Sequence, residues 1–379
     1  MDTDVPATPA PPPLSGAGQP PPLIAPPAKP RRTGRGWMIV SLVLLVLLVL
    51  SVASSFVHRV DGLTLRPRVL RHGGRPLQES VLEDNGSANK IAVVTVEGVI
   101  MSGAIDRSGR DLVSYIKDQL DMAADDRSVR AVILKVDSPG GEVLAADDIN
   151  HAITDFQERT KKPVVAAMGG LAASGGYYIS VPCRWIVANE LTITGSIGVI
   201  MHGYNYRGLL DKVGVRPMVF KSGKFKDMLS GEKPEDQILP EERAMVQSLV
   251  DQTFQKFKQV VQAGRQQADL ANRSGKDKGR PLVKNWADYA DGRILSGEQA
   301  YRYGFVDELG DFDAAVDRTE KLARIGAANL IQYEQVFDLS DLFSWFVKSD
   351  TPALKVDLGV ELPKLQAGRL YFLLPLAVR

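Results

Sequence analysis

The sequence has few of the residues on which several common kinds of functional site depend. Its 379 residues include one cysteine, Cys183, and four histidines. A single cysteine excludes a disulfide within the chain and a cysteine-rich metal site. The histidines, His58, His72, His151 and His202, do not have the spacing of metal ligands. The formal net charge is +1, so no basic excess favours nucleic acid as a partner.

The first 36 residues have a different composition from the rest of the chain. Eleven of the 23 prolines fall within residues 1–30, some of them in runs of three. Proline lacks the backbone N–H that helices and sheets require, so we expect residues 1–36 to form a disordered, partly polyproline tail. A docking site for a proline-binding partner is the less favoured alternative.

An uncharged apolar run follows this tail. Residues 37–57 contain no charged side chain, and a helix of that length crosses the roughly 30 Å hydrocarbon core of a bilayer. We predict a transmembrane helix here, with a cleaved signal peptide as the alternative because small residues end the run. Lysine and arginine residues flank the apolar run on both sides, so the distribution of positive charge gives little indication of which end is cytoplasmic. We expect a cytoplasmic N-terminus, the usual arrangement for one N-terminal anchor. Residues 58–90 are basic and polar, which predicts a juxtamembrane linker.

From residue 91 the sequence alternates between strand and helix patterns. Four short apolar runs have the composition of buried strands: 91–96, 131–136, 163–168 and 184–189. Apolar residues at helical spacing predict helices over 111–124 and 142–159. Strands that alternate with helices indicate an α/β fold with a mainly parallel sheet, covered on both faces.

The second half of the chain begins with a long amphipathic pattern. It predicts a helix from Pro240 to Gly264, with Gly264 as its C-cap. Residues 291–310 have the pattern of a strand, a short helix and another strand. After about residue 325 the patterns weaken, and residues 326–379 are assigned to a C-terminal extension. Within it, residues 368–378 are too short to span a membrane and are predicted to form a terminal strand.

Two glycine-rich turns each follow a buried strand and open onto a helix. The first is DSPGG at residues 137–141, and the second is ASGG at residues 173–176, which contains Ser174. Such a turn exposes backbone N–H groups at a helix N-terminus, where they stabilise a developing oxyanion. One of these segments alone would indicate only a tight turn. Two in successive units, one with a serine, indicate a nucleophile beside an oxyanion-binding backbone.

A serine nucleophile needs a general base, and the residues next to Ser174 supply none. One option is His202, 28 residues later in the chain. The other is a lysine from the group Lys221, Lys224 and Lys226, which lie among apolar residues. A lysine acts as a base only where burial or a nearby cation lowers its pKa by several units. Composition leaves this choice open, since most lysine runs are simply solvated.

Five motifs taken together resemble the signal peptide peptidase A family, the S49 serine peptidases, in its short single-repeat form. They are DSPGGEV (137–143), AASGGYYIS (172–180), TGSIGVI (194–200), KSGKFKDM (221–228) and DGRILSGEQAYRYGFVDELG (291–310). The resemblance covers roughly residues 91–320 and places a peptidase domain at 91–325. It implies a crotonase-like, Clp-protease-like fold of parallel strands and helices, here preceded by the predicted transmembrane helix.

The resemblance also implies the parts of an active site. By motif position, Ser174 is the nucleophile and Lys226 is the general base of a Ser/Lys dyad. The implied oxyanion hole consists of Gly140, Gly141 and Gly175, and the residue implied to orient the lysine is Ser196. No metal or organic cofactor is implied.

The function implied by the resemblance is that of a serine endopeptidase anchored in the bacterial cell membrane, with its catalytic domain outside the cytoplasm. Its substrates would be short apolar peptides, such as signal-peptide remnants. A homo-oligomer is implied as well, because in short members of the family serine and lysine can meet across a subunit interface. The alternatives are a non-catalytic membrane-bound scaffold and, less favoured, a crotonase-like acyl-CoA enzyme. The motifs of Ser174 and Lys226 argue against both.

Overall fold

The computed structural model describes residues 40–49, 76–103, 111–275, 277–335 and 370–373. The chain divides into two units, Met1–Leu65 and Arg66–Arg379. In the first unit, residues 40–49 form a helix whose side chains are exposed. Within the described ranges no helix combines the length and the apolar character that crossing a membrane requires. The rest of the predicted span 37–57, and the whole predicted tail 1–36, lie outside the described residues.

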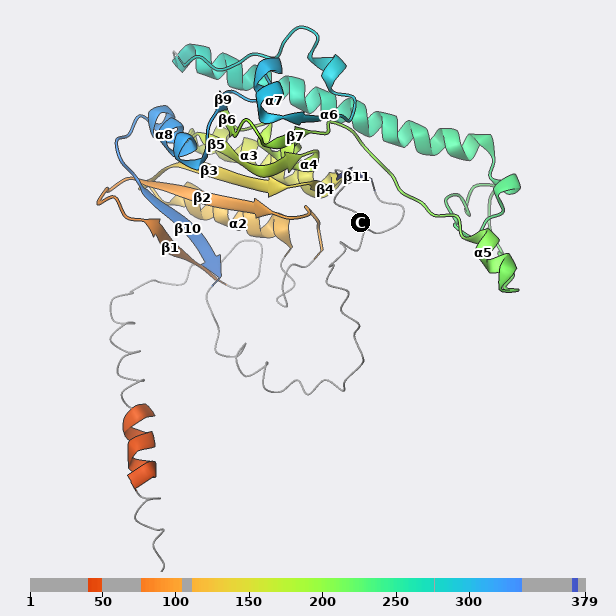
Figure 1. Ribbon diagram of the computed structural model, residues 1–379, viewed down its shortest axis with the longest axis horizontal. Coiled ribbons are helices and arrows are strands. Elements are labelled where there is room, and N and C mark those ends of the chain that lie inside the picture. The colour runs from red at the N-terminus through yellow and green to blue at the C-terminus, as the bar shows by residue number, and fades with distance from the viewer. Residues whose placement is uncertain (1–39, 50–75, 104–110, 276, 336–369, 374–379) are drawn as a thin grey trace, which may run out of the picture. The chain divides into compact units, whose positions relative to one another are not determined.

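The second unit contains a nine-stranded sheet with helices on both faces (Figure 1). Its central strands run in the order β10-β2-β3-β5-β6-β9, and every neighbouring pair in that series is parallel. β1 joins β10 antiparallel, and β7 pairs with β5 and with β8. The predicted α/β fold with a mainly parallel sheet is therefore confirmed. The bounds of these strands are β1 Leu77–Glu83, β2 Lys90–Glu97, β3 Val129–Ser138, β5 Val164–Ala173, β6 Trp185–Ala188, β7 Ile193–Gly195, β8 Ile294–Ser296, β9 Glu308–Leu309 and β10 Asn329–Gln335.

Two short strands form a separate pair. They are β4, Gly140–Glu142, and β11, Tyr371–Leu373, which run antiparallel to each other. The helices are α2 Leu112–Asp125, α3 Val143–Thr160, α4 Gly175–Ser180, α5 Arg207–Lys212, α6 Pro240–Gly275, α7 Gly297–Tyr303 and α8 Phe312–Ala323, with 3-10 turns at Glu235–Gln237 and Trp286–Tyr289.

Alternate residues of the central strands enter two separate apolar clusters, one on each face of the sheet. In β2, Ala92 and Val94 belong to the larger cluster, which α2 and α3 cover. Ile91 and Val93 belong to the smaller cluster, which α8 covers. Because both faces of the sheet are buried, the strands are apolar at successive positions, and this is why the sequence shows runs rather than alternation. Each such side chain contributes about 1.5–3 kcal/mol when fully buried.

The predicted end of the long helix at Gly264 is wrong, because α6 continues to Gly275. A Cβ at position 264 would lie 2.5 Å from the Cγ1 atom of Val181, so the glycine allows close packing and does not end the helix. The next turns are held by tertiary contacts that sequence periodicity does not reveal. Arg265 pairs with Asp307 in the interior, and both side chains are almost completely buried.

Two strands of the sheet come from segments that the sequence places outside the peptidase domain. β1 lies within residues 58–90, and β10 lies within residues 326–379. β10 is inserted between β1 and β2, parallel to β2. The pairing joins residues about 240 positions apart, such as Leu330 with Ile91, and local patterns carry no signal for contacts of that range.

Candidate active site

Ser174 lies at the end of β5, where the chain turns into α4. Its backbone has φ 54° and ψ −114°, a conformation that is rare for a residue other than glycine. Its N–H donates a hydrogen bond to the Gly195 carbonyl oxygen at 2.9 Å, and its own carbonyl accepts from the N–H of Tyr178 at 2.8 Å. These bonds hold a strained turn that costs of the order of 1–3 kcal/mol. Strain of this kind is concentrated at functional sites.

The hydroxyl of Ser174 is buried and has no hydrogen-bond partner among the residues that the structure describes. Only 1% of the residue is exposed. A buried polar group normally finds a partner, because leaving it unpaired costs free energy. The exception is typical of a group whose partner is supplied by a substrate or by another chain.

The two glycine-rich turns, far apart in the sequence, are packed against each other. A Cβ at Gly175 would lie 3.0 Å from the Cα of Gly140 and 3.0 Å from the backbone nitrogen of Gly141. A Cβ at Gly176 would lie 2.7 Å from the Ser138 carbonyl oxygen. No larger residue fits at this contact, so the glycines are required by close backbone approach. All three glycines of the expected oxyanion hole therefore lie beside Ser174.

Ser138 supports the first turn through its side chain. Its hydroxyl donates to the Gly98 carbonyl oxygen at 2.6 Å and accepts from the N–H of Gly140 at 3.1 Å. Gly140 itself has φ 98°, in the region that favours glycine. Because the N–H of Gly140 is already bonded, Gly141 and Gly175 are better placed to offer N–H groups to an oxyanion. Sequence reasoning missed Ser138, although it stands inside the quoted DSPGG motif.

Ser196 also adopts a left-handed conformation, with φ 50°, and is buried. It follows Gly195, whose carbonyl accepts the N–H of Ser174. Its own N–H donates to the Arg293 carbonyl oxygen at 2.7 Å. The TGS motif thus forms part of the support behind the turn of Ser174, and the hydroxyl of Thr194 donates a hydrogen bond to the Ala172 carbonyl oxygen at 2.6 Å.

The structure of one chain does not bring Lys226 to Ser174. Lys226 is exposed, and the Ser174 hydroxyl has no bonded partner within the described ranges. Lys226 lies between α5 and α6, in the segment of residues 203–239, which we call the arm. The α5 helix of the arm has no buried residue, and in Figure 1 it lies beyond the sheet. The expectation of an apolar setting around this amine is therefore wrong for the isolated chain.

A network of ion pairs surrounds Asp227, the residue that follows Lys226. Asp227 accepts hydrogen bonds from Lys221 at 2.7 Å and from Lys233 at 3.3 Å, and Lys233 in turn bonds Glu242 at 2.5 Å. The hydrogen bond from Lys221 is the main cause that lowers the pKa of Asp227, and Lys233 adds to it. This network ties the loop that carries Lys226 to the start of α6.

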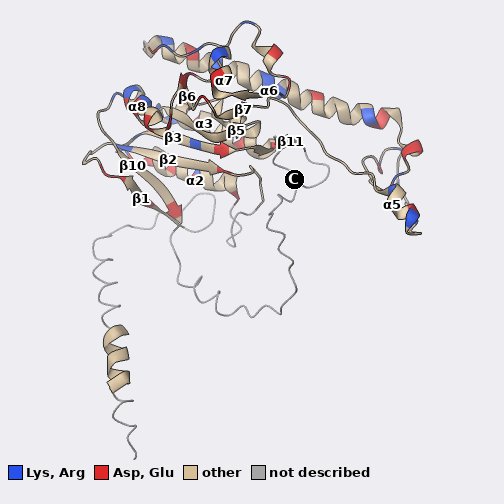
Figure 2. Ribbon diagram, in the orientation of Figure 1, with Lys and Arg blue, Asp and Glu red and all other residues tan. Residues whose placement is uncertain are grey.

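The alternative base His202 is exposed, and Ser174 has no hydrogen bond to it. Nor does the described part of the chain contain a group of three or more His, Cys, Asp or Glu side chains that could hold a metal ion. Figure 2 shows that acidic and basic residues are interspersed along α6.

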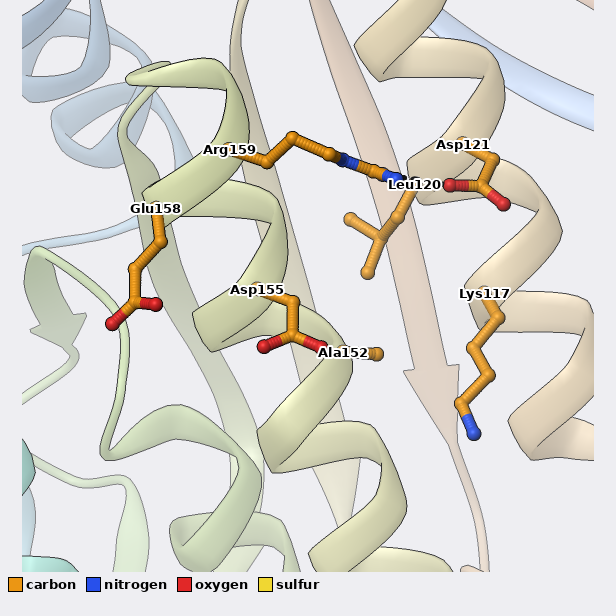
Figure 3. Close-up of a pocket in the computed structure, with 7 residues that line it drawn as sticks. All are labelled: Lys117, Leu120, Asp121, Ala152, Asp155, Glu158 and Arg159. Atoms are coloured by element: carbon orange, nitrogen blue, oxygen red, sulfur yellow. Dashed lines mark hydrogen bonds and ion pairs between the residues drawn. The ribbon is translucent and has the colours of Figure 1, made fainter.

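A hollow of about 700 Å³ lies elsewhere, between α2 and α3 (Figure 3). Its lining is mostly charged and includes an ion pair of 2.8 Å between Arg159 and Asp121. Neither of the glycine-rich turns contributes to it. The hollow is therefore separate from the candidate active site.

Comparisons with known proteins identify the family of the chain. The family model for peptidase family S49 matches residues 157–326. The chain is 38% identical over 241 residues to a protein of Synechocystis sp. named as a protease, a match that covers 64% of this chain and 74% of that one. It is 35% identical over 266 residues to a protein of Enterococcus faecium named as a signal peptide peptidase SppA, covering 69% and 72%. Protease 4 of Haemophilus influenzae is 35% identical over 244 residues, covering 64% of this chain and 36% of that protein.

Proposed function

The chain belongs to peptidase family S49 and is a serine peptidase, and we propose that Ser174 is its nucleophile and Lys226 its general base. The observation that carries this proposal is the Ser174 hydroxyl, buried and without a partner among the described residues, on a strained turn against which the Gly140–Gly141 backbone is packed. A serine nucleophile needs a separate general base, and the motif position that resembles the family's base is Lys226.

The proposed reaction is acyl transfer to water. The neutral amine of Lys226 accepts the proton of Ser174, whose oxygen attacks a peptide carbonyl carbon. The N–H groups of Gly141 and Gly175 hold the oxyanion that forms. The lysine then returns the proton to the leaving amine, and water hydrolyses the acyl-enzyme. Ser196 supports the turn that fixes the nucleophile, and no cofactor is required.

The dyad is proposed to form between subunits of a homo-oligomer. The arm that carries Lys226 exposes large apolar side chains, including Phe220 at 90%, Tyr204 at 81% and Met218 at 80% of their surface. Several large apolar side chains exposed on one segment favour an interaction surface. A neighbouring copy would cover these residues and bring Lys226 into an environment with less water, where an amine can be neutral.

Membrane attachment and substrate class complete the proposal. Residues 37–57 are proposed to anchor the chain in a bacterial cell membrane, with the catalytic domain outside the cytoplasm. The substrates are proposed to be short apolar peptides, such as signal-peptide remnants. Protease added to spheroplasts should then digest the domain, whereas protection of the domain would reverse the orientation.

A mixing experiment tests the shared dyad. Ser174→Ala and Lys226→Ala are each expected to be inactive alone. Co-expressed in equal amounts, they should regain about a quarter of wild-type peptidase activity, because one neighbouring pair in four combines an intact serine with an intact lysine. A mixture that stays inactive while both proteins co-assemble would contradict a dyad shared between subunits.

A further inference from the structure

A hollow of about 480 Å³ lies between the arm and the first two turns of α6, and we call it the arm hollow. Its lining includes large apolar side chains from both segments: Tyr204, Met228, Leu229, Ile238 and Val246. Ligand pockets in proteins typically measure about 300–1,000 Å³. The arm hollow is therefore large enough for a large side chain of a bound peptide.

Hydrogen bonds join the two segments of the arm that line the hollow. The N–H of Tyr206 donates to the Gly231 carbonyl oxygen at 2.9 Å, and the side-chain amide of Asn205 donates to the Lys233 carbonyl oxygen at 2.9 Å. A Cβ at Gly231 would lie 2.4 Å from the Tyr204 carbonyl oxygen, so only glycine allows this close backbone approach. The arm hollow is thus preformed in the single chain, as ligand pockets usually are.

The charged residues of the lining are paired. Lys233 and Glu242 are 8% and 2% exposed, and the lysine donates a hydrogen bond of 2.5 Å to the glutamate. Arg243, which is exposed, lies 3.7 Å from Glu235. A charged side chain that entered the hollow would lose its water without gaining a free counter-ion, whereas an apolar side chain gains free energy by leaving water. The lining therefore favours an apolar occupant.

The arm hollow lies next to the proposed general base along the chain. Met228, in its wall, is two residues after Lys226, so their Cα atoms are at most about 7.6 Å apart. Lys233, also in the wall, donates a hydrogen bond to Asp227 at 3.3 Å, which fixes the hollow to the loop that carries Lys226. The wall of the hollow therefore begins within the length of one or two side chains from Lys226.

The proposed chemistry determines which substrate residue comes close to Lys226. The lysine returns its proton to the leaving amine, so that nitrogen approaches the lysine Nζ to about 2.6–3.2 Å. The nitrogen belongs to the residue that directly follows the cut bond, and its Cα is only about 1.46 Å further along. The acyl side of the substrate, in contrast, is held at Ser174. A pocket beside Lys226 is thus within reach of the residue after the cut bond.

We propose that the arm hollow is the subsite for the residue that follows the cut bond, and that it selects a large apolar residue such as leucine there. The subsite rests on the proposed dyad of Ser174 and Lys226. Because the two residues of that dyad come from different subunits, the two sides of the substrate contact different chains. The chain that supplies the serine holds the acyl side, and the chain that supplies the lysine selects the leaving side.

An added amine tests the leaving side separately from the acyl side. A peptide ester first acylates Ser174, and the amine then competes with water for the acyl-enzyme. Its nitrogen forms a bond to the acyl carbon, the bond from that carbon to the Ser174 oxygen breaks, and the amine proton passes through Lys226 to that oxygen. This step reverses acylation by a peptide, so the amine occupies the place of the leaving residue. The ratio of amide to acid product does not depend on how much of the enzyme is folded.

The acceptors to compare are leucinamide and glycinamide. We expect the wild type to prefer leucinamide about tenfold, since the two differ by a side chain that the hollow buries. Val246→Trp fills the hollow and should lower the preference to about twofold or less. Val250→Trp is the matched control, at a half-buried valine one turn further along α6 and outside the lining, and should keep the wild-type preference. No preference in the wild type, or the same preference in Val246→Trp, would overturn the proposal.

A second variant gives a result that misfolding cannot imitate. Leu229 is 55% exposed, so the rim of the hollow can accept a charge at this position. Leu229→Glu should make argininamide a better acceptor than leucinamide, because the new carboxylate pairs with the guanidinium. An active Leu229→Glu protein that prefers leucinamide as strongly as the wild type does would contradict the subsite.

Mixed assemblies show which chain supplies the subsite. Val246→Trp in the Ser174→Ala chain, co-expressed with Lys226→Ala, should abolish the preference for leucinamide. The same substitution in the Lys226→Ala chain should leave it intact, and the reverse result would overturn the division between chains. A wild type that does not hydrolyse the ester would contradict the proposed function and the subsite with it. Hydrolysis without any preference would overturn the subsite alone.

Discussion

The turn of Ser174 and the arm of residues 203–239 are built in opposite ways. Around Ser174 every backbone neighbour is fixed by a hydrogen bond or by a contact that only glycine allows. Lys226 itself is exposed and α5 buries no residue, and the loop is held by short-range backbone hydrogen bonds together with side-chain ion pairs. The turn of Ser174 is packed by residues of its own chain, whereas the arm exposes apolar side chains that none of the described residues cover.

This difference separates two requirements of the chemistry. A nucleophile and an oxyanion site must be held to fractions of an ångström, and this demands a rigid turn on a buried sheet. A lysine base must be kept away from water, and this needs only a surface that covers it. In the proposed homo-oligomer a second subunit meets the second requirement, which is compatible with an arm that is exposed in the single chain.

The largest expected effect comes from the rigid region. Ser174→Ala removes the only proposed nucleophile and should lower peptide hydrolysis by at least about a thousandfold. The fold should be retained, because the lost hydroxyl has no bonded partner within the described residues. Activity on a fluorogenic peptide, with thermal unfolding alongside, measures both. The matched control is Ser248→Ala, which deletes a hydroxyl from the exposed face of α6 and should remain fully active. If Ser174→Ala were equally active, Ser174 would not be the nucleophile.

The next effect comes from the arm. Lys226→Ala and Lys226→Arg should each lose nearly all activity, because arginine keeps its proton near neutral pH and cannot act as a base. His202→Ala should keep most of it. In the wild type the rate should rise toward alkaline pH, since only the neutral amine accepts a proton. An inactive His202→Ala beside an active Lys226→Ala would move the protein to a Ser/His mechanism.

The same comparison shows how far the sequence leads. The sheet and the glycine-rich turns follow from apolar runs and local motifs, because buried parallel strands and tight turns leave local patterns. The position of β11 does not follow from local patterns, because its pairing joins Phe372 to Gly141 across some 230 residues. The apolar setting assumed for Lys226 also had no local basis, since neighbours in sequence do not determine burial. Contacts made by folding over long range, or by a second copy, are what the sequence alone leaves out.

Ion pairs offer a smaller test of the contrast between the two regions. Asp307→Ala leaves the guanidinium of Arg265 buried without its partner and should lower the free energy of unfolding by about 3–5 kcal/mol. Asp211→Ala breaks the exposed pair with Arg207 on α5 and should leave the free energy of unfolding almost unchanged, because solvent screens a surface ion pair. Urea unfolding of both variants gives the comparison. A similar decrease in the free energy of unfolding for both variants would show that the arm is as firmly packed as the sheet.

The smallest effect concerns the ion pairs beside Lys226. Because hydrogen bonds from Lys221 and Lys233 lower the pKa of Asp227, its contribution to stability is present above the usual range of an aspartate, near 4, and is lost as the pH falls through the lowered value. At neutral pH, Asp227→Asn should therefore loosen residues 221–233 without unfolding the sheet. We expect faster amide hydrogen exchange in that loop and a several-fold lower rate of peptide hydrolysis. Asp236→Asn, at an exposed position of the same arm, is the matched control. If exchange in the loop and hydrolysis were the same in both variants, the ion pairs of Asp227 would have no part in positioning Lys226.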